Sequence, residues 1–169
     1  MNKEQLLNRT DLSIDEIRKV IQNKSYTKSI SILCGEFINS GVYRDVYVCK
    51  LNPKFVIKIE KDPSICVFSN VNEWINYVNT TEWREFNRWL APCRMINETG
   101  TILIQDRVYH KKRKDYPKYI PNILTDTKLS NYGWIEDNFV CCDYPTFIQS
   151  GYKMKYVKWI GTLKGINGK

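Results

Sequence analysis

The chain has 169 residues, 43% of them hydrophobic and 26% charged, a composition that is typical of a globular protein and too apolar for a disordered one. This length predicts one domain that can bury a sizeable core without disulfides or a structural metal. The 26 lysines and arginines outnumber the 18 acidic residues, and the net charge of +8 favours phosphorylated or polyanionic ligands. Composition argues against collagen, coiled coils, membrane proteins and disulfide-rich miniproteins.

The beginning of the chain is polar and lacks the apolar core of a signal peptide, and no run of 18 apolar residues occurs. The single histidine, His110, leaves little for zinc sites or histidine-dependent catalysis. The cysteines lie in apolar runs without C-x-x-C spacing, which favours free thiols in a reducing compartment. We therefore expect a cytoplasmic protein with no membrane partner. The six cysteines are Cys34, Cys49, Cys66, Cys93, Cys141 and Cys142.

The first half of the sequence carries clear helix and strand signals. Ser13 and Glu16 form a capping box at the start of an amphipathic helix over 13–23. Alternating and helical patterns then follow in turn. In chain order, we expect strands over 29–34, 42–50 and 54–60, a helix from about 70 to 90 that is interrupted near 79–81, and a hairpin of strands over 93–97 and 101–105.

The second half is expected to be mostly irregular and helical. A basic run over 109–114 precedes a polar loop over 125–132 and a short apolar strand over 139–142. The tail from Tyr144 onward has five lysines and no acidic residue. Aromatic and apolar residues at helical spacing predict a last helix there. These residues are Tyr152, Tyr156, Trp159 and Leu163.

Two polar features mark the strands of the first half. Gly41 lies in the turn before the second strand, where a glycine lets a ligand approach the backbone, although a plain hairpin turn would use it equally well. Alternation places Val56 and Lys58 on the same face of the third strand, so an apolar side chain and an ammonium are neighbours. A lysine on a half-exposed strand is also common.

Glu73 lies near the start of the long expected helix. It can supply a carboxylate to a neighbouring cation, but Asn70 stands three residues earlier, and this spacing also fits a helix cap. Glu82 and Glu85 lie further along and compete for any pairing role.

The strongest pattern is a set of three oxygen-bearing side chains late in the chain. Asp126 and Asn131 follow D-x-x-x-x-N spacing, and Asp143 ends an apolar strand twelve residues later. A short strand, turn and strand fit between Asn131 and Asp143. Each residue type also favours turns, but their order downstream of the lysine strand is that of phosphoryl-transfer sites, where such oxygens orient an acceptor hydroxyl and hold magnesium.

Together these stretches resemble a compact, divergent protein-kinase-like fold of the small phage-encoded type, over roughly residues 29–144. The resemblance implies an α+β fold with a five-stranded antiparallel N-lobe sheet, one inserted helix and a strongly reduced helical C-lobe. It implies a single kinase-like domain over 1–169, with the N-lobe over about 26–106, preceded by the helix over 13–23, and the C-lobe over about 107–169.

The resemblance also implies ATP and Mg²⁺ as cofactors. Asp126 is the expected catalytic base, Lys58 the phosphate-binding ammonium, and Asn131 and Asp143 the metal ligands. The remaining residues expected to bind the nucleotide are Gly41, Val56, Glu73, Gln105 and Asp106. The implied function is phosphoryl transfer to a host target, in the host cytoplasm if the protein is phage-encoded.

Departures from the kinase pattern leave other functions open. Leu124-Thr125 stands where kinases have His-Arg, Pro145 stands where they have glycine, and the 26 residues after Asp143 are too few for an activation segment with docking helices. One alternative is therefore a catalytically inactive module that binds a host protein as an inhibitor or adaptor.

A third function, nucleic-acid binding, is suggested by cations beside aromatic rings. The run from His110 to Lys114 is basic, and the tail places lysines between aromatic residues. A solvated loop and a core-facing aromatic stripe account for the same residues. The tail residues concerned are Tyr152, Lys153, Lys155, Tyr156, Lys158 and Trp159.

Overall fold

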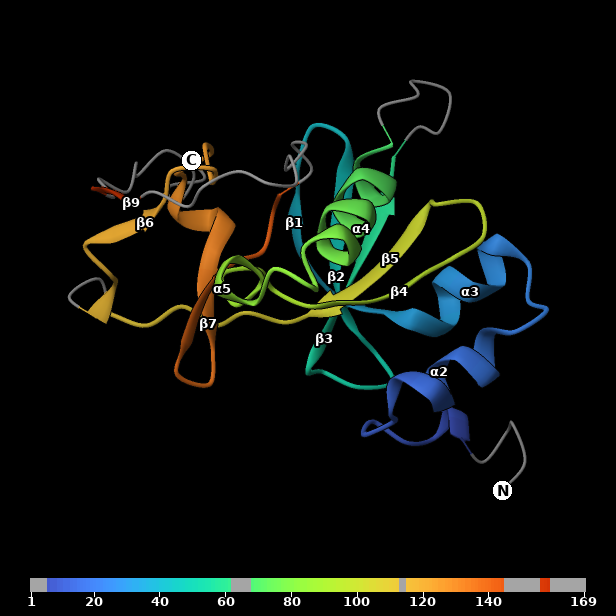
Figure 1. Cartoon of the computed structure of the whole chain (residues 1–169). Helices are drawn as coiled ribbons and strands as arrows, with labels where there is room; N and C mark the ends of the chain where they lie inside the picture. Colours follow the sequence, from blue (N-terminus) through green and yellow to red (C-terminus); the bar gives the residue numbers. More distant parts are fainter. Residues whose placement is uncertain (1–5, 62–67, 113–114, 145–155, 159–169) are drawn as a thin grey trace. The chain divides into compact units, whose positions relative to one another are not determined.

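The computed structural model of the chain describes residues 6–61, 68–112, 115–144 and 156–158 (Figure 1). The chain divides into two compact units. Unit 1 comprises Met1–Val71 and Cys93–Arg107, and unit 2 comprises Asn72–Pro92 and Val108–Lys169. The expected lobe boundary near residue 106 lies next to the end of unit 1, and the assignment of kinase-like lobes stays a prediction.

Unit 1 opens with two short helices. Helix α2 (Ile14–Ile21) begins at the predicted capping box, in which Ser13 Oγ accepts from the Glu16 N–H and the Glu16 carboxylate accepts from the Ser13 N–H. Helix α3 (Tyr26–Leu33) follows. The strand predicted over 29–34 is wrong, because these residues are helical up to Leu33. Their β-branched residues favour a strand, but Ser29 and Leu33 share one buried helical face, and packing outweighs propensity.

The five-stranded antiparallel sheet predicted for the first half is confirmed. Its strand order is β1-β2-β3-β5-β4, and α4 and α5 stand between β3 and β4 in the sequence. Gly100, at φ +73°, turns the chain between β4 and β5 in the predicted hairpin. The strands are β1 (Cys34–Ser40), β2 (Arg44–Cys49), β3 (Phe55–Glu60), β4 (Cys93–Ile96) and β5 (Ile102–Asp106).

The core of unit 1 packs against one face of this sheet. Ile57 and Ile59 of β3 face the helices, together with Ile104 of β5. Val56 and Lys58 alternate with them and lie on the opposite face, as predicted from the sequence. The core cluster comprises Leu6, Leu12, Ile17, Val20, Leu33, Cys49, Leu51, Ile57, Ile59, Met95, Ile102 and Ile104.

The interrupted helical stretch predicted between about 70 and 90 is also confirmed. Helix α4 (Ser69–Asn79) begins in unit 1 and continues in unit 2. It ends where the Thr80 hydroxyl donates to the carbonyl of Asn76 at 2.9 Å, a local bond that competes with helix continuation. Helix α5 (Arg84–Asn87) is a single turn, and its buried Phe86 packs against Trp83.

Short strands, rather than helices, make up the second half of unit 2. The predicted helical C-lobe is wrong for the part of 108–169 that the structure describes, which contains strands and a 3₁₀ turn and no α-helix. The predicted apolar strand is β8, and it pairs with β7. The elements are β6 (Tyr119–Pro121), the 3₁₀ helix η3 (Leu129–Asn131), β7 (Tyr132–Ile135), β8 (Asn138–Cys141) and β9 (Tyr156–Lys158).

The tail contributes a strand where a helix was predicted. Tyr156 belongs to β9, which pairs with β6. Aromatic and β-branched residues favour a strand where a neighbouring strand can pair with them. Tyr152, Lys153, Lys155, Trp159 and Leu163 lie outside the described residues.

Two broader expectations concern thiols and membranes. Five cysteines are free thiols as predicted, and Cys66 lies outside the described residues. Among the helices that the structure describes, none is long and apolar enough to cross a membrane.

Candidate functional site in unit 2

The polar loop predicted to carry the catalytic base begins at Asp126. Its carboxylate accepts the main-chain N–H of Lys128 at 3.3 Å and lies 3.2 Å from the Lys128 ammonium. Both side chains are about half exposed, so the ion pair adds little stability, but it orients the carboxylate. The loop continues into the 3₁₀ helix η3, whose first residue, Leu129, is buried.

The β7–β8 hairpin connects Asn131 to Asp143. Tyr132 pairs directly with Cys141, so the two ends of the hairpin lie together. Beyond this pair, the Cys142 N–H donates to the Asn131 carbonyl at 2.8 Å. The strand, turn and strand predicted between these residues is therefore present. As a result, Asn131 and the residue before Asp143 are neighbours.

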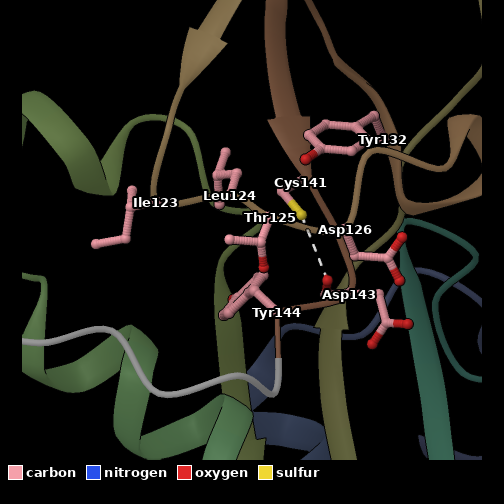
Figure 2. Close-up of a pocket in the computed structure, with 8 residues that line it drawn as sticks. All are labelled: Ile123, Leu124, Thr125, Asp126, Tyr132, Cys141, Asp143 and Tyr144. Atoms are coloured by element: carbon pink, nitrogen blue, oxygen red, sulfur yellow. Dashed lines mark hydrogen bonds between the residues drawn. The ribbon is translucent and has the colours of Figure 1, made fainter. Parts of the chain in front are cut away.

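Asp126 and Asp143 line one pocket of about 290 Å³, part of which is open to solvent. Figure 2 shows their carboxylates pointing to the same side, away from Ile123 and Leu124. Asn131 is not among the lining residues. The pocket is lined by Ile123, Leu124, Thr125, Asp126, Tyr132, Cys141, Asp143 and Tyr144.

Asp143 is held on both sides by residues that are themselves fixed. Cys141 exchanges main-chain bonds with the segment after α5, donating to Trp89 at 2.7 Å and accepting from Ala91 at 2.8 Å. Tyr144 is buried; its hydroxyl donates to the carbonyl of Ala91, and its own carbonyl accepts from Asn76 Nδ2 at 2.9 Å. The backbone around Asp143 is thereby fixed within unit 2, so its carboxylate has a defined place in the pocket.

The other acidic groups of the pocket are protonated at neutral pH. Burial raises the pKa of the Tyr132 hydroxyl far above its ordinary value. Burial likewise raises the pKa of the Cys141 thiol, which donates to the carbonyl of Asp143 at 3.4 Å (Figure 2). The negative charge of the pocket is therefore carried by Asp126 and Asp143.

Asn131 contributes a buried amide beside this pocket. The side chain is 7% exposed, and its Nδ2 has no hydrogen-bond partner within the described part of the chain. Its Oδ1 accepts a long bond of 3.4 Å from the Ser130 hydroxyl. A buried amide nitrogen without a partner is a position that a bound group would satisfy.

Glu73, also in unit 2, is fully buried on α4. Its competitors Glu82 and Glu85 are both exposed. A glutamate is rarely buried unless it is paired, so burial favours Glu73 over the two alternatives for a specific role.

Three of the residues predicted to bind the nucleotide lie on the face of the unit 1 sheet opposite the core cluster. Val56, Lys58 and Gln105 are all buried there, and Gln105 stands directly opposite Val56 in the sheet. Gln105 Nε2 contacts the Cys93 sulfur at 3.8 Å. Lys58 is only 4% exposed, which is unusual for a lysine without a structural or functional reason.

Asp106 is committed to an ion pair within unit 1. Arg94 Nε donates to its Oδ1 at 2.7 Å and Arg94 Nη2 to its Oδ2 at 2.5 Å, a bidentate arrangement. The Asp106 side chain is therefore neutralised, and its main chain lies opposite Phe55 in the sheet.

Gly41 lies in the β1–β2 turn as predicted. Its N–H donates to the Arg44 carbonyl at 2.8 Å, and its own carbonyl accepts from Lys61 Nζ at 2.6 Å. A Cβ added here would meet its nearest neighbour at an ordinary 3.5 Å. The turn itself therefore does not require glycine at this position.

A buried polar network at the start of α4 was not predicted. Asn70 Nδ2 donates to the carbonyls of Lys58 and Thr101 at 3.1 Å each, and the Asn70 N–H donates to Glu60 at 2.6 Å. Arg44 completes the network by donating to Asn70 Oδ1 at 3.2 Å. Asn70, whose spacing to Glu73 also fitted a helix cap, instead belongs to this network. The network joins α4 to β3 within unit 1.

Sequence reasoning also missed several residues of the pocket. Lys128, which pairs with Asp126 but does not line the pocket, could have been found from its place two residues further along the same loop. Tyr132 was assigned to the polar loop, Cys141 to the apolar strand and Tyr144 to the tail, and only the hairpin brings them beside the two carboxylates. Neither a family model nor a curated protein matches this chain.

Proposed function

We propose that the protein is a kinase-like phosphotransferase that binds ATP with magnesium. The observation that carries this proposal is the shared pocket of Asp126 and Asp143, at the two ends of a segment that contains Asn131 and one hairpin. The order of the sheet, with a helix between β3 and β4 in the sequence, supports it.

The donor set of the pocket fits magnesium. Mg²⁺ binds oxygen ligands, needs only one or two carboxylates, and completes its shell with phosphates and water. Asp143 supplies such a carboxylate, and the sulfur of Cys141 is occupied by the Asp143 carbonyl. When bound, magnesium would neutralise charge on the phosphates. No group of three or more metal-binding His, Cys, Asp or Glu side chains exists within the described ranges, so a closed structural metal site is not what these residues offer.

Each of the proposed residues then has one task. Asp126 accepts the proton of the acceptor hydroxyl and is held in place by Lys128. Asp143 and Asn131 bind the metal, and Lys58 binds the phosphates. Glu73, Gly41, Val56, Gln105 and the main chain of Asp106 contribute to nucleotide binding.

Thermal unfolding with ATP and magnesium tests the binding step. Saturating ligand stabilises the folded state by about 2–4 kcal/mol, so we expect the Tm of the wild type to rise by several degrees. Asp143→Asn is expected to lose most of this rise. Asp137→Asn, which removes the same charge from the exposed β7–β8 turn, is the matched control and keeps the full rise. A wild type that is not stabilised at millimolar ATP contradicts the proposal.

Phosphoryl transfer from labelled ATP to protein or small-molecule hydroxyls tests the chemistry. Asp126→Asn is expected to abolish transfer while leaving Tm and ATP binding unchanged. Asp115→Asn, at another exposed aspartate of unit 2, is expected to behave like the wild type.

The second candidate, an inactive kinase-like module that binds a host protein, is favoured by one specific departure. Pro145 follows the Asp143-Tyr144 pair, and proline restricts the main chain where active kinases need freedom. In that case ATP binding persists, no transfer occurs with any acceptor, and Asp126→Asn leaves the biological effect intact.

A further inference from the structure

The β6–β9 pair brings two basic segments of unit 2 together. In the sequence, one is the run that contains Lys111, Lys112 and Lys118, and the other is the tail, which has five lysines and no acidic residue. Tyr119 of β6 stands directly opposite Lys158 of β9. Lys118, just before β6, and Lys158 of β9, which are distant in the sequence, are therefore neighbours at one small sheet.

An aromatic ring and a cation share the exposed face of this sheet. Residues directly opposite each other in an antiparallel pair lie on the same face. Tyr119 is 56% exposed, whereas the next residue, Ile120, is fully buried, so Tyr119 points outward. Lys158 is exposed, as is Lys118, which precedes Tyr119. We call Lys118, Tyr119 and Lys158 the β6–β9 patch.

One of the exposed acidic side chains of unit 2 is paired with a lysine. Asp137 of the β7–β8 turn lies 3.2 Å from the Lys111 ammonium, which also sits over the Trp134 ring. Asp115 and Glu136 are exposed and lie outside β6 and β9. The strands of the patch carry no acidic residue, so its local charge is positive.

We propose that the β6–β9 patch binds single-stranded nucleic acid. Exposed lysines supply contacts to phosphates, and an outward tyrosine supplies a surface on which an unpaired base stacks, a combination typical of single-strand binding. An acidic peptide would contact the lysines but would not need the tyrosine ring. A duplex would satisfy the lysines but keep its bases stacked on one another. The proposal is independent of the proposed phosphotransferase activity.

Fluorescence anisotropy with the full chain and a labelled oligothymidine of about 20 nucleotides tests this proposal. We expect binding that weakens steeply between about 50 and 200 mM salt. Lys118→Glu with Lys158→Glu is expected to lower the affinity at least tenfold and to reduce the salt slope by about 1.4, since each phosphate contact on a single strand contributes about 0.7. Tyr119→Ala is expected to lower the affinity about fivefold or more.

A matched control exists in unit 1, where Lys24, Tyr26 and Lys28 are all exposed on or beside α3. Lys24→Glu with Lys28→Glu changes the net charge equally, and Tyr26→Ala removes a ring that is also exposed. Both are expected to keep the affinity within about twofold. Lys58→Met is expected to do the same, which separates this site from the proposed ATP site.

Four results would overturn the proposal. They are no binding at about 50 mM salt, equal loss in the control variants, an unchanged affinity of Tyr119→Ala, and equal affinity for a duplex or for polyglutamate of the same length. The last result would assign the patch to duplex DNA or to an acidic protein instead. Circular dichroism confirms that each variant is folded, which is expected because every substituted side chain other than Lys58 is exposed.

Discussion

The N–H of Cys142 donates a 2.8 Å hydrogen bond to the carbonyl of Asn131. This bond lies just outside the Tyr132–Cys141 pair and closes the open end of the β7–β8 hairpin. The residue before Asp143 therefore lies next to Asn131, at the end of the loop that starts at Asp126. The two carboxylates share a pocket because a tightly closed hairpin separates them in the sequence but not in space.

The position of Asp143 depends on Asn76, whose side chain holds the carbonyl of Tyr144. Asn76→Ala leaves that buried carbonyl without this donor, and we expect the free energy of unfolding to fall by about 1–3 kcal/mol. Urea denaturation measures the change. Asn79→Ala, at the exposed end of α4, is the control and should change stability by less than about 0.5 kcal/mol. Equal stability of the two variants would show that Asn76 does not hold this segment.

Lys128 should affect activity much more than stability. Its ion pair with Asp126 is half exposed, so Lys128→Met is expected to change the free energy of unfolding by less than about 1 kcal/mol. If Asp126 is the base, losing the ammonium that orients it should reduce the rate of phosphoryl transfer at least tenfold. Rates from labelled ATP, compared with Lys112→Met, measure this effect. A rate equal to that of the wild type removes Lys128 from the site.

Gly100 and Gly41 should respond differently to alanine. Gly100 has φ +73°, and a Cβ there would lie 2.4 Å from Cγ2 of Val71, so Gly100→Ala is expected to destabilise unit 1 by about 1–3 kcal/mol. Gly41→Ala meets only ordinary contacts and should cost less than about 1 kcal/mol. Thermal and urea unfolding of both variants provide the measurement. Val71→Ala combined with Gly100→Ala should recover part of the loss, and the absence of recovery would contradict the steric explanation.

Stability should decline at alkaline pH. Burial raises the pKa of the Cys34 thiol from 9.0 to about 11 and also raises the pKa of Cys49. The unfolded chain therefore releases these protons first, so the stabilisation is complete below pH 9 and is lost as the pH rises toward about 11. Urea unfolding at several pH values across this window should show the decline, and Cys34→Ala should make it shallower. An identical decline in that variant would contradict the assignment.

Local patterns predicted most of unit 1. Alternation in β3 placed Val56 and Lys58 on one face, and the hairpin at Gly100 follows from turn chemistry. The first strand was missed because β1, at the edge of the sheet, is exposed at every residue after Cys34 and pairs with β2 through two irregularities in register. Such a strand carries no alternation to read.

The second half was harder to predict because its elements depend on partners. Tyr156 fits a helical spacing equally well, and only the edge of β6 decides that it lies in a strand. Tyr132 and Cys141 look like ordinary core residues until the hairpin places them around the two aspartates.

The sequence by itself determined the residue types, their order and most of the strands, because side-chain periodicity and turn chemistry act over a few neighbouring residues. It therefore predicted the loop that contains Asp126, the hairpin that follows it, and the position of Asp143 at the end of an apolar strand. Only the tertiary structure decided which groups meet: that Asp126 and Asp143 share a pocket, that Arg94 neutralises Asp106, and that β9 pairs with β6. These contacts join segments distant in the sequence, and they depend on packing and hydrogen bonds that no local pattern encodes.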